Sequence, residues 1–148
     1  MLKVRDIMNG NFFSIPSHTP VIEVANQMRE ERVTAIPVCD GGKFQGIVTI
    51  EDFVDFVANG IDPVIAPVIS IINDHCPVIS PGITIVQALE MMTENHTHVL
   101  VVMRNGKMQG FLTLEDIVQK SQPLLGMVFG KTSKTGTQAN KKQAGKQL

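Results

Sequence analysis

The sequence repeats itself at a constant offset of 64 residues. Residues 43–54 read KFQGIVTIEDFV and residues 107–118 read KMQGFLTLEDIV, so the pattern K-x-Q-G-x-x-T-x-E-D-x-V occurs twice. The same offset pairs residues outside this pattern: Ile15 with Ile79, Met28 with Met92, and Val38 with Val102. Self-similarity at one period is typical of a structural unit present in two copies. We therefore expect two similar units that share a core, since a unit of about 60 residues buries little apolar surface alone.

Both copies predict the same order of secondary structure, β-α-β-β-α. In the first copy, strands are expected over residues 12–15, 35–39 and 44–48, with one helix after Thr19 and another from Thr49. The second copy predicts the equivalent strands over residues 78–79, 99–103 and 108–112, and helices that start at Thr84 and Thr113. Apolar residues at helical spacing and alternating strand patterns support these assignments. The predicted fold class is therefore α/β (α+β), built from tandem repeats.

Turn residues and composition divide the chain further. Gly41-Gly42 and Asn105-Gly106 separate the paired strands and are typical of tight hairpin turns. We expect a first repeat over residues 1–60, a second over 61–121 and a C-terminal segment over 122–148. That segment is basic and lacks apolar periodicity from about residue 130, where we expect disorder. Residues 122–129 are apolar and could pack on the body or on a partner.

Composition favours a globular protein over several other classes. Hydrophobic residues make up 43% of the chain and charged residues 18%, as in globular domains. No apolar stretch is long enough to cross a bilayer and no signal-peptide pattern opens the chain, so we expect a cytoplasmic protein without membrane contact. Residues 1–120 carry a net charge of −6 and residues 121–148 one of +5, so nucleic-acid binding is not expected of the body.

No pattern of catalytic or metal-binding residues is present in the sequence. It contains no nucleophile elbow, phosphate-binding lysine loop or zinc-ligand spacing. Four side chains contain potential metal-ligating atoms but lack the spacing of a known site: His75, Cys76, His96 and His98. We expect neither enzyme activity nor a required cofactor.

The doubled pattern G-h-h-T-x-x-D, where h is apolar, resembles a pair of CBS domains, often called a Bateman module. The resemblance covers about residues 1–121, and one departure is that Pro37 of the first copy becomes Val101 in the second. It implies two units packed sheet to sheet about a pseudo-twofold axis, with two related clefts. In many relatives the clefts bind AMP, ADP, ATP or S-adenosylmethionine, and the modules pair into dimers that regulate a partner.

The resemblance assigns ligand contacts to the repeated threonine and aspartate: Thr49 with Asp52, and Thr113 with Asp116. An ionised carboxylate accepts hydrogen bonds from a ribose diol, and a helix N-terminus suits a phosphate. The same residues also make a capping arrangement that starts a helix. The two roles are compatible, and the sequence leaves both open.

Further candidates line the adenine and phosphate subsites that the resemblance implies. An apolar slot for adenine is expected from strand residues and the segments before them: Ser14, Ile15, Ala35, Ile36, Pro37, Ile79 and Val99. His98 lies where adenylate-sensing relatives carry a basic residue that contacts phosphate. The alternatives are an ordinary core for the apolar residues and a solvent-facing position for His98.

The sequence thus predicts a stand-alone sensor of an adenine nucleotide or S-adenosylmethionine. We expect no output domain on this chain and therefore a separate protein partner, and we expect a homodimer. The alternative is an adaptor that dimerises without a ligand. Nucleic-acid binding through the lysine-rich tail is a third, weaker possibility.

Overall fold

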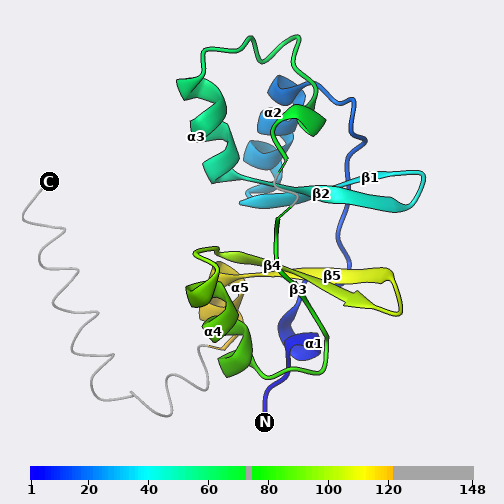
Figure 1. Cartoon of the computed structure of the whole chain (residues 1–148), viewed down its shortest axis with the longest axis vertical. Helices are drawn as coiled ribbons and strands as arrows, with labels where there is room; N and C mark the ends of the chain where they lie inside the picture. The colour runs from blue at the N-terminus through cyan, green and yellow to red at the C-terminus, as the bar shows by residue number, and fades with distance from the viewer. Residues whose placement is uncertain (73–74, 122–148) are drawn as a thin grey trace, which may run out of the picture.

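The computed structural model describes residues 1–72 and 75–121, so the predicted disordered tail lies outside the described residues. Two halves are stacked with their small sheets facing each other and helices on the outer sides (Figure 1). The elements of the first half are α2 (Val21–Glu31), β1 (Ala35–Asp40), β2 (Lys43–Thr49) and α3 (Ile50–Ala58). Those of the second are β3 (Val78–Ile79), α4 (Ile85–Glu94), β4 (Val99–Arg104), β5 (Lys107–Thr113) and α5 (Leu114–Lys120). The predicted fold class is confirmed.

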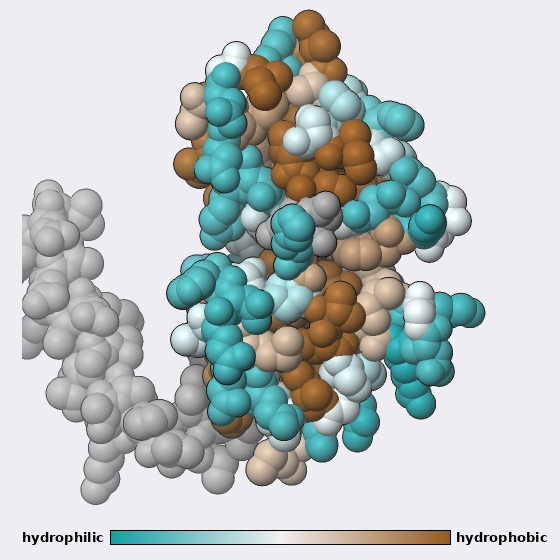
Figure 2. Space-filling view, viewed as in Figure 1, coloured by the Kyte–Doolittle hydropathy of each residue, from teal (hydrophilic) through white to brown (hydrophobic). Residues whose placement is uncertain are grey.

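Two matching hairpins form the centre of the molecule. Strands β1 and β2 pair antiparallel from Ala35 opposite Thr49, and β4 and β5 pair from Val99 opposite Thr113. Their turns use residues with positive φ, among them Gly42 at 81° and Gly106 at 74°, as tight hairpins require. Both hairpins project to the same side of the molecule (Figure 1), and Figure 2 shows hydrophilic tips with a hydrophobic recess between them.

The first strand of each unit differs between the repeats. The strand predicted over residues 12–15 is reduced to a single parallel bridge between Ile15 and Val38, whereas β3 pairs along two residues with β4. In the second repeat, the backbone N–H of Val101 donates to the Pro77 carbonyl at 2.9 Å. The equivalent position in the first repeat is Pro37, which has no N–H to donate. The departure between the two motifs therefore accounts for the shorter pairing.

The first opening segment packs on the second repeat. Helix α1 (Val4–Ile7) buries Val4 and Ile7 in a cluster with residues of α4, β4, β5 and α5. The Val4 N–H donates to the Ile83 carbonyl at 2.9 Å, and the Lys120 ammonium donates to the Ile7 carbonyl at 2.9 Å. The core of the second repeat is therefore completed by residues from the beginning of the chain.

The second opening segment makes the reciprocal contact with the first repeat. The 3-10 helix η1 (Val68–Ser70) buries Val68 among apolar residues of α2, β1 and β2. The Val68 N–H donates to the Thr19 carbonyl at 2.8 Å. Each core thus uses residues from both repeats. The predicted boundary at residue 60 divides the sequence into its two repeats, and it stays a prediction.

The two sheets meet in a small apolar layer. Ala35 and Ile47 from the first hairpin cluster with Val99 and Phe111 from the second. The ring of Phe12 packs edge-on against Phe111, with centroids 6.1 Å apart. Within residues 1–72 and 75–121, no helix combines the length and apolar character that a bilayer crossing requires.

Candidate ligand-binding clefts

The cleft that contains Asp116 is lined by both repeats. Its volume is about 130 Å³, and the second repeat contributes Thr113 and Asp116 from the start of α5. The first repeat contributes Arg32 and Ala35 from the junction between α2 and β1. Because both repeats meet here, a bound molecule would contact the two units at once.

Hydrogen bonds occupy one oxygen of Asp116 and leave the other available. Its Oδ2 accepts from the Thr113 N–H at 3.0 Å and from the Thr113 hydroxyl at 2.7 Å. The side-chain amide of Asn9 donates to the same oxygen. No described residue makes a hydrogen bond to Oδ1. The capping role and a ligand role are therefore compatible in this carboxylate, because a carboxylate has a second oxygen that can accept.

A glycine of the repeated motif allows Asn9 to reach the cleft. Asn9 and Phe111 exchange backbone hydrogen bonds of 2.9 and 3.2 Å, which brings the N-terminal segment against β5. A Cβ atom on Gly110 would overlap the carbonyl oxygen of Asn9. Gly110 is therefore needed for the close approach of the two backbones.

The second aspartate has the same capping arrangement. The Oδ2 of Asp52 accepts from the Thr49 N–H at 2.8 Å and from the Thr49 hydroxyl at 3.1 Å. Burial raises the pKa of Asp52 above its ordinary value, and the hydrogen bonds from Thr49 oppose part of that rise. The nearby carboxylates of Glu51 and Asp55 raise the pKa further.

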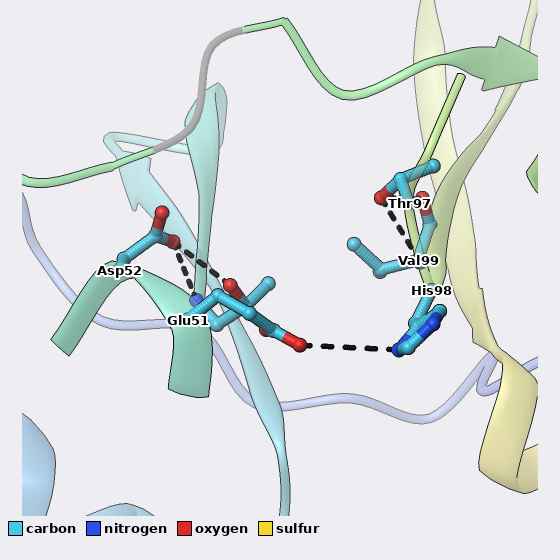
Figure 3. A network of polar contacts seen from close by, with 6 residues as sticks. Glu51, Asp52, Thr97, His98 and Val99 are labelled. Carbon is cyan, nitrogen blue, oxygen red and sulfur yellow. Dashed lines mark hydrogen bonds and ion pairs between the residues drawn. The ribbon is translucent and has the colours of Figure 1, made fainter. Parts of the chain in front are cut away.

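His98 faces the first repeat from the N-terminal end of β4. Its Nδ1 lies 3.9 Å from Oε1 of Glu51, and the two side chains are 72% and 71% exposed. Figure 3 shows this contact between the repeats, with Asp52 one residue beyond Glu51. The pair attracts only when the histidine is protonated, and its exposure keeps the interaction weak.

Cys76, one of the candidate metal-ligating residues, is partly buried beside Val99. Burial raises the pKa of its thiol to about 12, and the Sγ atom donates to the Val99 carbonyl at 3.3 Å. Across the described part of the chain, no three His, Cys, Asp or Glu side chains gather in a way that could hold a metal ion.

The structure places the residues predicted for the adenine slot in several environments. Ala35 lines the Asp116 cleft, and Val99 lies in the layer between the sheets. Ile15 and Ile36 lie in the core of the first repeat and Ile79 in that of the second, each at most 5% exposed. Pro37 is buried in β1, and Ser14 lines a separate groove between the hairpin tips. The cleft thus brings together Thr113, Asp116 and Ala35 from the predicted set.

Asn9 and Arg32 are two of the cleft residues that were not among the predicted site residues. Asn9 binds the site carboxylate, and Arg32 contributes a positive charge from the first repeat. The repeat offset gave a signal for both, because it pairs Asn9 with Asn73 and Arg32 with His96. Arg32 and His96 also share a left-handed backbone, with φ of 55° and 51°. Residue 73 lies outside the described residues.

Comparison with known proteins agrees with this architecture. Over 121 residues the chain is 28% identical to Hypoxic response protein 1 of Mycobacterium tuberculosis, which covers 80% of this chain and 85% of that protein. A crystal structure of Hypoxic Response Protein I with two coordinated zinc ions matches 79% of this chain and 97% of its own, with a TM-score of 0.67. An uncharacterised conserved protein of Pyrococcus horikoshii shares the fold at 23% identity and a TM-score of 0.74, covering 81% and 92% of the two chains.

The family comparison matches both repeats separately. The model of the CBS domain fits residues 4–59 and again residues 68–122. These two ranges hold both repeated motifs, with Asp52 in the first and Asp116 in the second. The chain therefore belongs to the CBS-domain family, as a protein with a pair of CBS domains.

Proposed function

We propose that this protein is a stand-alone regulatory module that binds an adenosyl compound between its two CBS repeats and signals to a separate partner. CBS-domain pairs are regulatory modules, which favours a role in binding over catalysis. The observation that carries the proposal is the free Oδ1 of Asp116 in a cleft lined by both repeats. A ligand held there would bias how the repeats pack, which is a signal that a partner can detect.

The cleft supplies groups that suit a nucleoside with few charges. A ribose diol would donate to Oδ1 of Asp116, and Arg32 would attract a phosphate. Arg32 is the only cation among the described lining residues, which also include the carboxylates of Glu115 and Asp116. We therefore expect AMP or S-adenosylmethionine to bind more tightly than ATP, whose additional phosphates would be repelled.

Thermal unfolding of the full chain with each compound tests the proposal. The chain has no Trp or Tyr, so an external dye reports unfolding. A ligand at 100 times its Kd adds about 2.7 kcal/mol to the stability of the folded state. A midpoint rise of several degrees is expected, at roughly 2–8 °C per kcal/mol. If AMP, ADP, ATP and S-adenosylmethionine all leave the midpoint unchanged, the adenosyl proposal is wrong.

Matched variants locate the site. Asp116→Asn and Asp52→Asn each keep an oxygen for the helix cap but lose the charge that a ribose would contact. We expect Asp116→Asn to remove most of the ligand-induced shift, and Asp52→Asn to do so if the second cleft is also occupied. Asp55→Asn is the control, because Asp55 is an exposed carboxylate on α3 outside the capping arrangement.

Dimerisation is proposed through the exposed face of α3. Ile50, Val54 and Val57 are 50%, 63% and 73% exposed on this helix, and Val118 on α5 is 48% exposed. Exposed apolar side chains that gather on one face favour an interface between copies. The same face supports a second candidate function, an adaptor that dimerises without a ligand. A dimer whose stability no adenosyl compound changes would favour that alternative.

A further inference from the structure

A second recess lies between the tips of the two hairpins, away from the Asp116 cleft and from the Asp52 helix cap. Its volume is about 960 Å³, within the range of small-molecule sites. Strand β2 runs from Lys43 at this recess to Thr49 at the Asp52 helix cap, and β5 runs likewise from Lys107 to Thr113. Six steps along a strand amount to about 20 Å, so this groove is separate from the clefts.

The walls of the groove consist of residues that the repeat offset pairs. They are Lys43 with Lys107, Phe44 with Met108, and Cys39 with Met103. Because each pair has one member in each repeat, the groove lies between the repeats at the hairpin end of the molecule. Phe12 completes the apolar lining. Figure 2 shows the hydrophobic surface between the two hydrophilic tips.

The two lysines give this apolar groove a positive rim. Neither ammonium group forms an ion pair within the described residues, and no acidic side chain lines the groove. Asp40 is the register neighbour of Lys43, but its Oδ1 accepts from the Ser17 N–H at 2.9 Å. In the second repeat, Arg104 takes the place of Asp40 and adds a further positive charge beside Lys107.

We propose that this groove binds an amphipathic organic anion, a carboxylate carried on an apolar chain. The carboxylate lies between Lys43 and Lys107, and the chain lies over Phe44, Met103 and Met108. Methionine side chains adapt to irregular apolar ligands. The lysine ammonium groups attract a carboxylate that stays partly exposed to water. Because the two lysines belong to different repeats, the ligand links the two hairpins.

Octanoate is the probe, and the methionine methyl groups are the reporters. The full chain, labelled with 13C at its methionine methyl groups, is titrated with octanoate and followed by NMR. The resonances of Met103 and Met108 should shift and saturate, whereas those of Met28 and Met92 in the two cores should not. Octylammonium, with the opposite charge on the same chain length, should bind much more weakly. Equal binding of octanoate and octylammonium would overturn the proposal.

Charge variants test the role of the rim. Lys43→Gln and Lys107→Gln should each weaken octanoate binding about threefold to fivefold, as expected for a partly exposed ion pair, and together about tenfold. Met103→Glu should abolish binding by placing a carboxylate in the groove. Arg29→Gln on α2 removes the same charge elsewhere and should change nothing. An unchanged affinity in the double lysine variant would show that the anion binds at another place and would refute the assignment.

The lysine variants also separate binding in the groove from binding in the nucleotide cleft. Lys43→Gln and Lys107→Gln should leave stabilisation by AMP unchanged, because both residues lie at the opposite ends of their strands. Octanoate should still shift Met103 and Met108 in a protein that responds to no adenosyl compound. The groove proposal therefore stands or fails independently of the proposed nucleotide site.

Discussion

The side-chain amide of Asn9 donates a hydrogen bond to Oδ2 of Asp116, 107 residues further along the chain. The bond joins the N-terminal segment to the carboxylate that we place in the ligand site. It also helps to turn one oxygen of Asp116 toward the helix cap, so that the other remains available. The geometry of the cleft therefore depends on a residue outside the repeated motif.

Asn9→Ala should weaken both the fold and the site. A hydrogen bond to a charged group contributes about 1.5–3 kcal/mol of stability. Because this site is only partly buried, we expect the loss to fall at or below the lower end of that range. Adenosyl ligands should stabilise the variant less than the wild type at the same concentration. Thermal unfolding with and without AMP measures both effects. Asn11→Ala, at an exposed position two residues later, is the control.

Gly110→Ala gives an independent check of the same contact. A Cβ atom there collides with the Asn9 carbonyl oxygen, so the N-terminal segment must move. The variant should reproduce the loss of ligand stabilisation seen in Asn9→Ala. Full ligand stabilisation in both variants would contradict a positioning role for Asn9.

The Asp52→Asn variant should become more stable relative to the wild type as the pH rises. Burial raises the pKa of Asp52 above 3.8, so the folded protein holds this proton more tightly than the unfolded chain does. Ionisation of Asp52 consequently lowers the free energy of unfolding as the pH rises from 3.8 through the folded pKa. Asparagine lacks this titration, so the variant gains stability relative to the wild type between about pH 4 and pH 7. Urea unfolding at both pH values measures the change.

The control for this titration is Glu30→Gln, which removes an exposed carboxylate on α2 that is not among the charges acting on Asp52. Its stability relative to the wild type should change less between the two pH values. A loss of relative stability of Asp52→Asn with rising pH would contradict the burial effect.

Val101→Pro should destabilise the protein more than Pro37→Val does. The first variant removes the hydrogen bond from the Val101 N–H to the Pro77 carbonyl and should cost about 1–3 kcal/mol. The second supplies an N–H that the first repeat lacks, but it also gives the unfolded chain more freedom, so its net effect should stay below about 1 kcal/mol. Urea unfolding compares the two. Equal losses would show that the strand pairing of the two repeats is not governed by this position.

Val54→Lys and Val57→Lys should dissociate the proposed dimer. Both residues are exposed on α3, at 63% and 73%, so a lysine there leaves the monomer fold intact. A charge in an apolar interface has no partner and weakens association. Sedimentation over a range of concentrations measures the change. Val86→Lys, at a 61% exposed position on α4, should leave association unchanged. A wild-type monomer at high protein concentration would refute the dimer.

The local features of this fold could be predicted from the sequence. Thr113 and Asp116 form the capping box that the motif predicts, and Asn105-Gly106 adopt the positive φ values of a tight turn. Such features depend on residues within three or four positions of each other, so the local sequence specifies them. The strand predicted over residues 12–15 is longer than the observed pairing. Its pairing depends on a backbone donor in β1, and Pro37 of that strand has no N–H.

The arrangement between the repeats is harder to predict. Arg32 enters the Asp116 cleft only because the first repeat packs against the second, and no local pattern indicates which segments will meet. The same holds for Val4, whose apolar character is visible in the sequence but whose core belongs to the other repeat. The repeat offset relates equivalent positions, and the packing decides which of them face one another.

The exchange of opening segments affects how the chain folds as it is synthesised. Ile7 is synthesised before Lys120, which follows 113 residues later and donates a hydrogen bond to the Ile7 carbonyl. The core that Ile7 shares with Ile117 cannot close until the second repeat is almost complete. Until then α1 exposes apolar side chains that have no native partner, a state prone to non-native association. A nascent chain stopped after the first repeat would therefore expose Val4 and Ile7 to association with other apolar surfaces.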